Sequence, residues 1–275
     1  MWVIKQGASP HPIFKDLIVK EINSDTCLIP RSLIKVWRLI CAGLATNSRH
    51  RSGMPLYAWV DQFKRLRWNI ILKQELFYLL QPLVGFRQSL HGRLQREEGE
   101  TSQQDANRSP HFRDYADWEI CLRTGEHPWE KLREIKTHID WARVAVECLP
   151  GFTALLRDTL ELMAELEGAS DKSDLSYIHR PSITDHEQNN DYHEWTSLIE
   201  LCRDAWLSVA AQNPSFAKTE LERWKLIRYP LFRRFEFFAS SESSLVQPTE
   251  GLALLLQDDG WWMWSEGAPE IWTMC

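Results

Sequence analysis

Glycine is scarce in this sequence, and the glycine-dependent signatures of common enzymes are missing. The chain has 12 Gly in 275 residues. None of them forms a phosphate-binding loop or a dinucleotide-binding fingerprint, and no GxSxG nucleophile elbow or HExxH zinc helix is present. These absences exclude the familiar motifs of nucleotide-binding, serine-hydrolase and zinc-protease sites, so the sequence assigns no catalytic residue.

Closely spaced cysteines and long apolar runs are missing as well. The 6 Cys lie at positions 27, 41, 121, 148, 202 and 275, and no two of them form a CxxC pair. Four fall in apolar helical stripes, which favours reduced, buried thiols and a cytoplasmic location. No run reaches the ~18 apolar residues that a membrane span needs. We therefore expect no membrane contact, and the sequence assigns no metal and no cofactor.

Positive charge is absent from the C-terminal part of the chain. Residues 240–275 contain no Lys or Arg but six acidic residues. A basic series precedes them, namely Arg223, Lys225, Arg228, Arg233 and Arg234. Its side chains either pair with the acidic end or bind a partner protein, with Arg228, Arg233 and Arg234 as the candidates. Nucleic-acid binding along Arg223–Arg234 ranks last. The chain has a net charge of -6, which argues against nonspecific contact with phosphate backbones.

Strand signals are scarce, whereas helical periodicity runs through the chain. No Asn-Gly or Asp-Gly turn separates two alternating apolar runs. From Trp195 onward, apolar residues recur in steps of three and four, which is the stripe of an amphipathic helix. The sequence therefore predicts an all-α fold, an irregular array or solenoid of antiparallel amphipathic helices.

Prolines and glycines punctuate these expected helices. The pattern predicts helices at residues 11–22, 30–44, 55–66, 68–81, 114–121, 127–148, 152–167, 195–212, 215–229, 230–239 and 248–256, with a further helical segment after Pro82 that reaches residue 94. Leu66, Ile139 and Trp224 are expected to face inward. Pro150 and Gly151 are expected to form a tight connection. Gly168 is a natural helix stop, Ser215 a helix cap, and Pro230 a first helical residue.

A polar stretch divides the chain. Residues 96–110 contain no large apolar side chain, so they cannot bury enough surface to offset the entropy of ordering. We predict an N-terminal helical group at 1–95, a flexible polar linker or loop at 96–110, and a C-terminal helical domain at 111–275 with a tryptophan-rich end.

A second polar stretch, HRPSITDHEQNN at residues 179–190, holds the candidate site. Its side chains predict a structured hydrogen-bonding loop built on Arg180, His186, Gln188 and Asn189. A metal site would need three or four convergent ligands, and the proline break in this stretch argues against that convergence. An enzyme of unrecognised type, with a polar site around Arg180, His186 and Asn189, is the alternative.

Tryptophan is abundant, and it is concentrated at the end. The chain has 14 Trp, four of them in the last fifteen residues. The terminal repeat of a solenoid normally carries a polar outer face, so an aromatic end is typical of a docking surface. Trp261, Trp262 and Trp264 are therefore candidates for partner binding. Burial against the helices of residues 191–239 is the alternative.

Several segments of the last hundred residues resemble a known class of proteins. These segments are HRPSITDHEQN, EWTSLIELCRDAW, ERWKLIRYPLFRRFEFFA and LLLQDDGWWMWSEGAPEIW. Together they resemble, over about residues 175–275, the C-terminal helical regions of large bacterial defence-associated proteins, which follow a sirtuin-like or nucleoside-triphosphatase effector. No residues here match such an effector, so its activity is not carried over.

The resemblance implies a sensor or scaffold region that acts with other protein subunits or with the remainder of a longer chain. We therefore expect a non-enzymatic helical scaffold that mediates protein–protein interaction, in bacterial antiviral defence.

Overall fold

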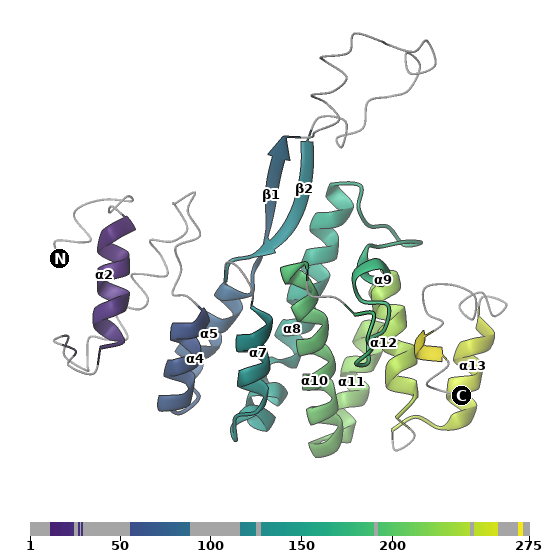
Figure 1. Ribbon diagram of the computed structural model, residues 1–275. Coiled ribbons are helices and arrows are strands. Elements are labelled where there is room, and N and C mark those ends of the chain that lie inside the picture. The colour runs from purple at the N-terminus through teal and green to yellow at the C-terminus, as the bar shows by residue number, and fades with distance from the viewer. Residues whose placement is uncertain are drawn as a thin grey trace, which may run out of the picture. The chain divides into compact units, whose positions relative to one another are not determined.

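The computed structural model describes residues 12–24, 27, 29, 56–88, 116–124, 128–189, 192–242, 245–257 and 269–271. Helices make up most of this part of the chain, and one two-stranded sheet accompanies them (Figure 1). The all-α prediction is confirmed. No helix among these residues has both the length and the apolar character needed to cross a membrane.

The chain folds into two compact units that interleave along the sequence. Unit 1 takes its residues from 1–81, 122–155 and 197–217, and unit 2 takes its residues from 82–121, 156–196 and 218–275. Each unit is described by itself below. The linker predicted at residues 96–110 and the helix predicted at 30–44 lie outside the described residues, so they stay predictions.

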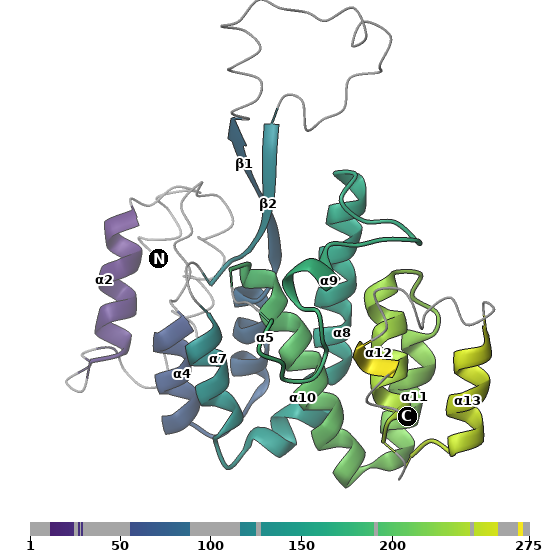
Figure 2. The same cartoon turned by 45° about the vertical axis from the view of Figure 1, so that its right-hand side comes forward.

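Unit 1 consists of helices whose apolar stripes face one another. Its elements are α2 (Pro12–Ile22), α4 (Leu56–Arg65), α5 (Ile70–Leu79), α7 (Trp129–Lys136), the first part of α8 (Trp141–Glu165) and α10 (Ser197–Gln212). Helix α4 packs against α5 and α7, and α7 packs against α10 (Figure 2). Trp59 and Phe63 of α4 stack with ring centroids 5.3 Å apart. The Trp59 indole N–H donates to the Leu72 carbonyl at 3.0 Å, which ties α4 to α5.

The helix predicted at residues 127–148 is interrupted between α7 and α8. The Thr137 hydroxyl donates to the Glu134 carbonyl at 2.9 Å, and the Asp140 N–H donates to His138 Nδ1 at 3.2 Å. Such local side-chain bonds compete with the helical backbone pattern. The prediction that Ile139 faces inward is wrong, because its side chain is 91% exposed. Leu66, at 45% exposure, is also not a core residue.

The predicted break at Pro150 and Gly151 is wrong, because α8 continues through both residues. A proline inside a helix costs ~3 kcal/mol in an isolated context, so tertiary packing outweighs it here. A Cβ at position 151 would lie 2.3 Å from the ring of Phe77. Glycine fits this position because the Phe77 ring of α5 lies against the backbone of α8. Helix propensities of neighbouring residues cannot predict this contact, because Phe77 is distant in sequence.

Residues 82–88 and 116–122 are strands, where the sequence predicted helices. Strands β1 (Pro82–Gln88) and β2 (Ala116–Leu122) pair with each other in a two-stranded sheet. Next to this pair, the Arg123 N–H donates to the Gln81 carbonyl at 3.2 Å. Short strands separated by residues 89–115 carry no tight-turn signature. The two strands form because segments distant in sequence pair with each other, and a pattern of neighbouring residues cannot predict such a pairing.

Unit 2 contains the helices that carry the candidate site. They are the second part of α8, α9 (Ser176–His179), the 3₁₀ turn η3 (Glu194–Thr196), the end of α11 (Pro214–Trp224), α12 (Pro230–Ser240) and α13 (Pro248–Leu256). Trp224 is fully buried, as predicted, with its ring centroid 4.8 Å from that of Phe235. Phe237, Leu254, Leu255 and Ile271 form a second apolar cluster.

The ends of three helices follow local chemistry. Pro230 is the first residue of α12, as predicted. At the start of α11, the Asn213 side chain accepts from the Phe216 N–H at 3.2 Å, so Asn213 is the cap and not Ser215. After α8, Glu167 adopts a positive φ of 60°. The Gly168 N–H then donates to the Met163 carbonyl at 2.7 Å, which closes a Schellman-type end.

Candidate functional site

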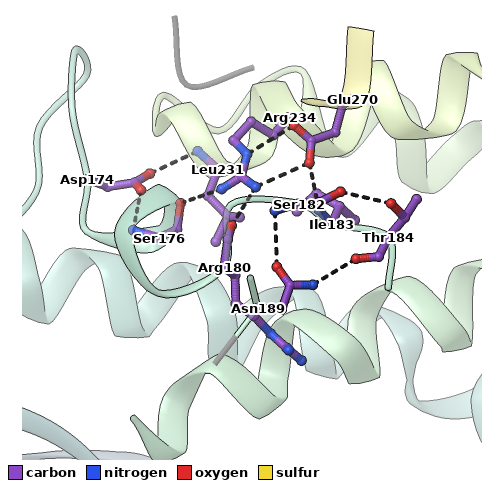
Figure 3. A network of polar contacts seen from close by, with 10 residues as sticks. All are labelled: Asp174, Ser176, Arg180, Ser182, Ile183, Thr184, Asn189, Leu231, Arg234 and Glu270. Carbon is purple, nitrogen blue, oxygen red and sulfur yellow. Dashed lines mark hydrogen bonds and ion pairs between the residues drawn. The ribbon is translucent and has the colours of Figure 1, made fainter. Parts of the chain in front are cut away.

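An ion pair inside unit 2 organises the candidate site. Arg234 extends from α12 and Glu270 from a helical turn at residues 269–271, and both side chains have 0% exposure. Arg234 Nη2 lies 3.2 Å from Glu270 Oε1, and Nε lies 3.3 Å from Oε2. Figure 3 shows the two groups side by side. This paired contact fixes the guanidinium plane and holds the C-terminal turn against α12.

The remaining donors of Arg234 hold a loop that is distant in sequence. Its Nη2 donates to the Arg180 carbonyl at 2.6 Å, and its Nη1 donates to the Ser176 hydroxyl at 3.2 Å. Glu270 Oε1 also accepts the Ile183 N–H at 2.6 Å. A buried charge is tolerated when its hydrogen-bonding capacity is used. Here Arg234 and Glu270 bond the Ser176 hydroxyl, the Arg180 carbonyl and the Ile183 N–H.

Asp174 joins the same loop to the start of α12. Its carboxylate accepts the Ser176 N–H at 2.8 Å and the Leu231 N–H at 2.8 Å. The Leu231 N–H belongs to the first turn of α12, where backbone donors have no partner within the helix and negative charge is favoured. Asp174 therefore caps α12 from a separate segment and positions the entry to α9.

Asn189 closes the outer part of the loop on itself. Its side-chain oxygen accepts the Ser182 N–H at 3.1 Å, and its Nδ2 donates to the Thr184 carbonyl at 2.8 Å. The hydroxyls of Ser182 and Thr184 lie 2.8 Å apart. These contacts link Ser182, Thr184 and Asn189 within the loop (Figure 3).

The four predicted loop residues have different positions. Arg180 is buried and enters the network through its carbonyl, while its side chain points away from Arg234 (Figure 3). Asn189 is bonded within the loop. His186 and Gln188 are exposed, and the Gln188 N–H donates to His186 Nδ1 at 3.2 Å. Of the three residues of the alternative polar site, Arg180 is thus buried, Asn189 is half-buried and His186 is exposed.

Two histidines form a contact that the sequence reading did not anticipate. The ring centroids of His179 and His193 lie 3.9 Å apart, and the Trp195 ring meets His179 edge-on at 6.3 Å. Burial, and then the neighbouring His193, lowers the pKa of His179 to about 4. Burial lowers the pKa of His193 too, although the charge of Glu119 opposes this shift. Both rings are therefore neutral at neutral pH.

A row of exposed apolar side chains flanks this histidine pair. Tyr177 and Ile178 precede His179 on α9, and Tyr192, which precedes His193, is 87% exposed. We call Tyr177, Ile178 and Tyr192 the presented surface. The buried network bonds the backbone at Ser176 and Arg180, on either side of Tyr177 and Ile178, and all three side chains of the presented surface are exposed.

Each residue of the basic series pairs with an acidic residue, and the pairs differ in how deeply they are buried. Arg228 lies 3.3 Å from Glu161 at the surface. Arg233 lies 2.8 Å from Glu236 and donates to the Gln257 side chain at 2.7 Å. Arg234 is fully buried. Pairing with the acidic C-terminal part is thus real for Arg234, through Glu270. Trp261, Trp262 and Trp264 lie outside the described residues.

Asp174, Ser176 and Glu270 are site residues that the sequence reading missed. Glu270 entered it only as one of six acidic residues in the C-terminal part. A lone acid directly before Ile271, in an apolar context, was the available signal. Among the residues that the structure describes, no group of three or more His, Cys, Asp or Glu side chains is arranged to hold a metal ion.

Comparison with known proteins found no relative. No protein family, no curated protein and no solved structure matches this chain.

Proposed function

We propose that this chain is a non-enzymatic protein-interaction region, and that Tyr177, Ile178 and Tyr192 form the centre of its recognition surface. The observation that carries the proposal is the Arg234–Glu270 pair. Both side chains have 0% exposure, and together they bond the backbone at Arg180 and Ile183. The network thus supports the loop that displays the presented surface.

The energetics of a buried ion pair support this interpretation. Removing two charges from water costs several kcal/mol per ion, so such a pair adds little to stability by comparison with apolar residues. Its contribution is geometric, because it restricts the loop to one conformation. Recognition residues are commonly held on loops that a rigid scaffold positions, and a restrained loop loses less entropy on binding.

The chemistry of the presented surface fits a protein partner. Tyrosine offers a large contact area with few rotatable bonds, and it is enriched at the energetic centres of interfaces. Tyr177 and Tyr192 flank Ile178 and the neutral histidine pair, so the surface combines apolar area with a few polar edges.

The two alternative functions have less support. For nucleic-acid binding, the basic series offers little uncompensated charge, because Arg223 pairs with Glu220, Lys225 with Glu222 and Arg233 with Glu236. For an enzyme, Asn189 is engaged in two bonds within its own loop. No specific observation favours either function.

A role in bacterial antiviral defence, with other subunits or the remainder of a longer chain as partners, is a further part of the proposal. It rests on the resemblance of the segments at residues 179–189, 222–239 and 254–272. The network takes Arg180, Arg234 and Glu270 from these three segments in turn. Segments that resemble the defence proteins therefore act together in one structural unit, which supports treating them as one functional region.

Co-purification tests the interaction. The tagged full chain is expressed together with the products of its neighbouring genes, and bound proteins are quantified by mass spectrometry. We expect Ile178→Asp and Tyr192→Asp to reduce recovery of a bound protein at least tenfold, without changing the melting temperature. Tyr57→Asp, at an exposed aromatic residue of unit 1, is the matched control and should retain it. Equal recovery with all three variants would contradict the proposed surface.

A further inference from the structure

Exposed apolar side chains also gather at one end of unit 1. Leu66 follows α4, Ile70 begins α5, and Ile139 lies between α7 and α8. Their exposed fractions are 45%, 64% and 91%. Keeping apolar side-chain surface in water is unfavourable, and most of the surface of Ile70 and Ile139 is exposed. They indicate a surface that a partner covers.

Contacts of Phe63 show that these segments lie together. The Phe63 ring meets Trp68 edge-on, with centroids 5.9 Å apart, and it packs on His138 at 4.7 Å. Trp68 lies between Leu66 and Ile70 in sequence, and His138 is next to Ile139. One buried ring therefore supports both exposed segments from below.

Hydrogen bonds hold this end of unit 1 in one shape. Arg143 Nη2 donates to the Trp68 carbonyl at 3.1 Å, and the Trp68 indole N–H donates to Glu147 at 2.8 Å. The Asn69 side chain accepts from the backbone N–H groups of Ile71 and Leu72 at 3.0 and 3.2 Å. The apolar side chains thus project from a fixed base, which reduces the entropy cost of binding.

Basic residues surround Leu66 in the sequence. Leu66 lies within the run Lys64–Arg67, which contains three basic residues and no acidic one, while Asp140 follows Ile139. Lys64 pairs with Glu134, Arg65 also has an interaction partner, and the side chains of Arg65 and Arg67 are exposed. We call Leu66, Ile70 and Ile139, together with Arg65 and Arg67, the basic-apolar surface. A complementary occupant has large apolar side chains and acidic neighbours.

We propose that this surface binds the acidic, tryptophan-rich segment at residues 258–266 of a second copy of the chain. That segment, DDGWWMWSE, has three tryptophans, one methionine and three acidic residues, without a basic one. Its composition is therefore complementary to the basic-apolar surface in both charge and apolar content. The proposal concerns unit 1 and is independent of the function proposed for the presented surface.

Such a contact is heterologous, because one copy contributes the surface and the other contributes the segment. Heterologous contacts join copies head to tail, and they produce rings or open chains unless one element is blocked. The average mass in solution should therefore rise with protein concentration. Because charge complementarity contributes, the association should weaken as the salt concentration rises from ~0.05 to ~0.5 M.

A complementation experiment tests this contact with the full chain. The surface variant is Ile139→Asp, and the segment variant carries Trp261→Ser, Trp262→Ser and Trp264→Ser. By analytical ultracentrifugation, we expect each variant alone to associate at least tenfold more weakly than the wild type. An equimolar mixture of the two should form a heterodimer, because the intact surface of one copy can meet the intact segment of the other. Leu226→Asp, at an exposed leucine of unit 2, should leave association unchanged.

Three results would overturn the proposal. A wild-type chain that stays monomeric at all concentrations has no such contact, and a mixture that fails to form a heterodimer has no head-to-tail pairing. An equal loss with Leu226→Asp would place the contact elsewhere. If the surface variant unfolds, Arg67→Glu provides the second test at an exposed position, where a tenfold weakening that disappears at high salt is expected.

Discussion

Unit 1 and unit 2 fix their chain segments in different ways. In unit 1, aromatic rings such as Trp59 and Phe63 fill the space between helices, and the ion pairs include partly exposed ones such as that of Lys131 with Glu134. In unit 2, a fully buried pair, Arg234–Glu270, bonds directly to the loop backbone. Apolar packing tolerates small shifts, whereas a satisfied polar network permits only one geometry. Unit 2 is therefore the better candidate for displaying a recognition loop.

The comparison predicts its largest effect at Arg234. Arg234→Ala leaves the Glu270 carboxylate buried without its partner, which should cost about 3–5 kcal/mol of the free energy of unfolding. Urea denaturation measures this loss. Arg233→Ala is the comparison on the same helix. It also removes a partner of a buried carboxylate, that of Glu236, but Arg233 itself is 17% exposed whereas Arg234 has no exposure, so the loss should be smaller.

A double variant tests whether the loss of stability comes from the unpaired charge of Glu270. Arg234→Met combined with Glu270→Leu removes both charges and should recover most of the stability, while the presented surface loses its fixed backbone. If Arg234→Ala costs no more than Arg233→Ala, the inner network does not organise unit 2.

The second largest effect on stability is expected from apolar packing in unit 1. Gly151→Ala places a methyl group against the Phe77 ring, and overpacking of this kind typically costs about 1–3 kcal/mol. In the Phe77→Ala background the sign should reverse, because alanine favours a helix over glycine by about 1 kcal/mol. Thermal unfolding of the four proteins in this cycle measures the coupling. An equal effect in both backgrounds would refute the close approach.

The histidine pair predicts a pH dependence in unit 2. The pKa of His179 falls from 6.5 to about 4 on folding, so the unfolded chain binds more protons than the folded chain between these values. The free energy of unfolding should therefore be complete above pH 6.5 and decrease as the pH falls toward 4. Urea midpoints at pH 7 and pH 5 compare the two conditions.

Two variants separate this effect from general acid sensitivity. His179→Phe should flatten the decrease between pH 7 and pH 5, while His186→Gln, at an exposed histidine of the same loop, serves as the control. Both histidines are partly exposed to solvent, which keeps the effect modest. A slope that survives in His179→Phe would assign it to other groups.

A backbone effect at the end of α8 should be smaller and stabilising. Glu167 has a positive φ of 60°, which glycine adopts without strain, so Glu167→Gly should gain about 1 kcal/mol. Glu165→Gly, the same substitution at a helical residue of α8, should instead lose about that amount. Chemical denaturation should give opposite signs for the two variants, and equal signs would contradict the left-handed assignment.

The surface pair of Arg228 with Glu161 should give the smallest effect. Both side chains are largely in water, and exposed pairs contribute little, because solvent screens them. Arg228→Ala should leave the urea midpoint unchanged within error. A loss comparable to that of Arg234→Ala would remove the distinction between inner and outer charges.

Local sequence patterns predicted what depends on neighbouring residues. The helix at Pro12–Ile22, the inward Trp224 and the start of α12 at Pro230 follow from periodicity and proline chemistry. The polar loop was also visible, because its amide and hydroxyl side chains can only be satisfied by one another or by water. The strand pair and the continuous α8 were not visible, since each depends on a distant segment. The exposed Ile139 was missed for a local reason, because side-chain bonds interrupt the helix between α7 and α8.

The sequence by itself determined the helical character of the chain, the amphipathic stripes and the imbalance between its basic series and its acidic end. It did not determine which basic residue meets that end, because Arg233 and Arg234 are adjacent and have the same charge. The tertiary structure decided this by turning Arg234 toward Glu270 and the carbonyl of Arg180. The physical reason is that a rotation of about 100° per residue along a helix separates neighbours onto different faces. Packing of residues far apart in sequence then determines which face is buried.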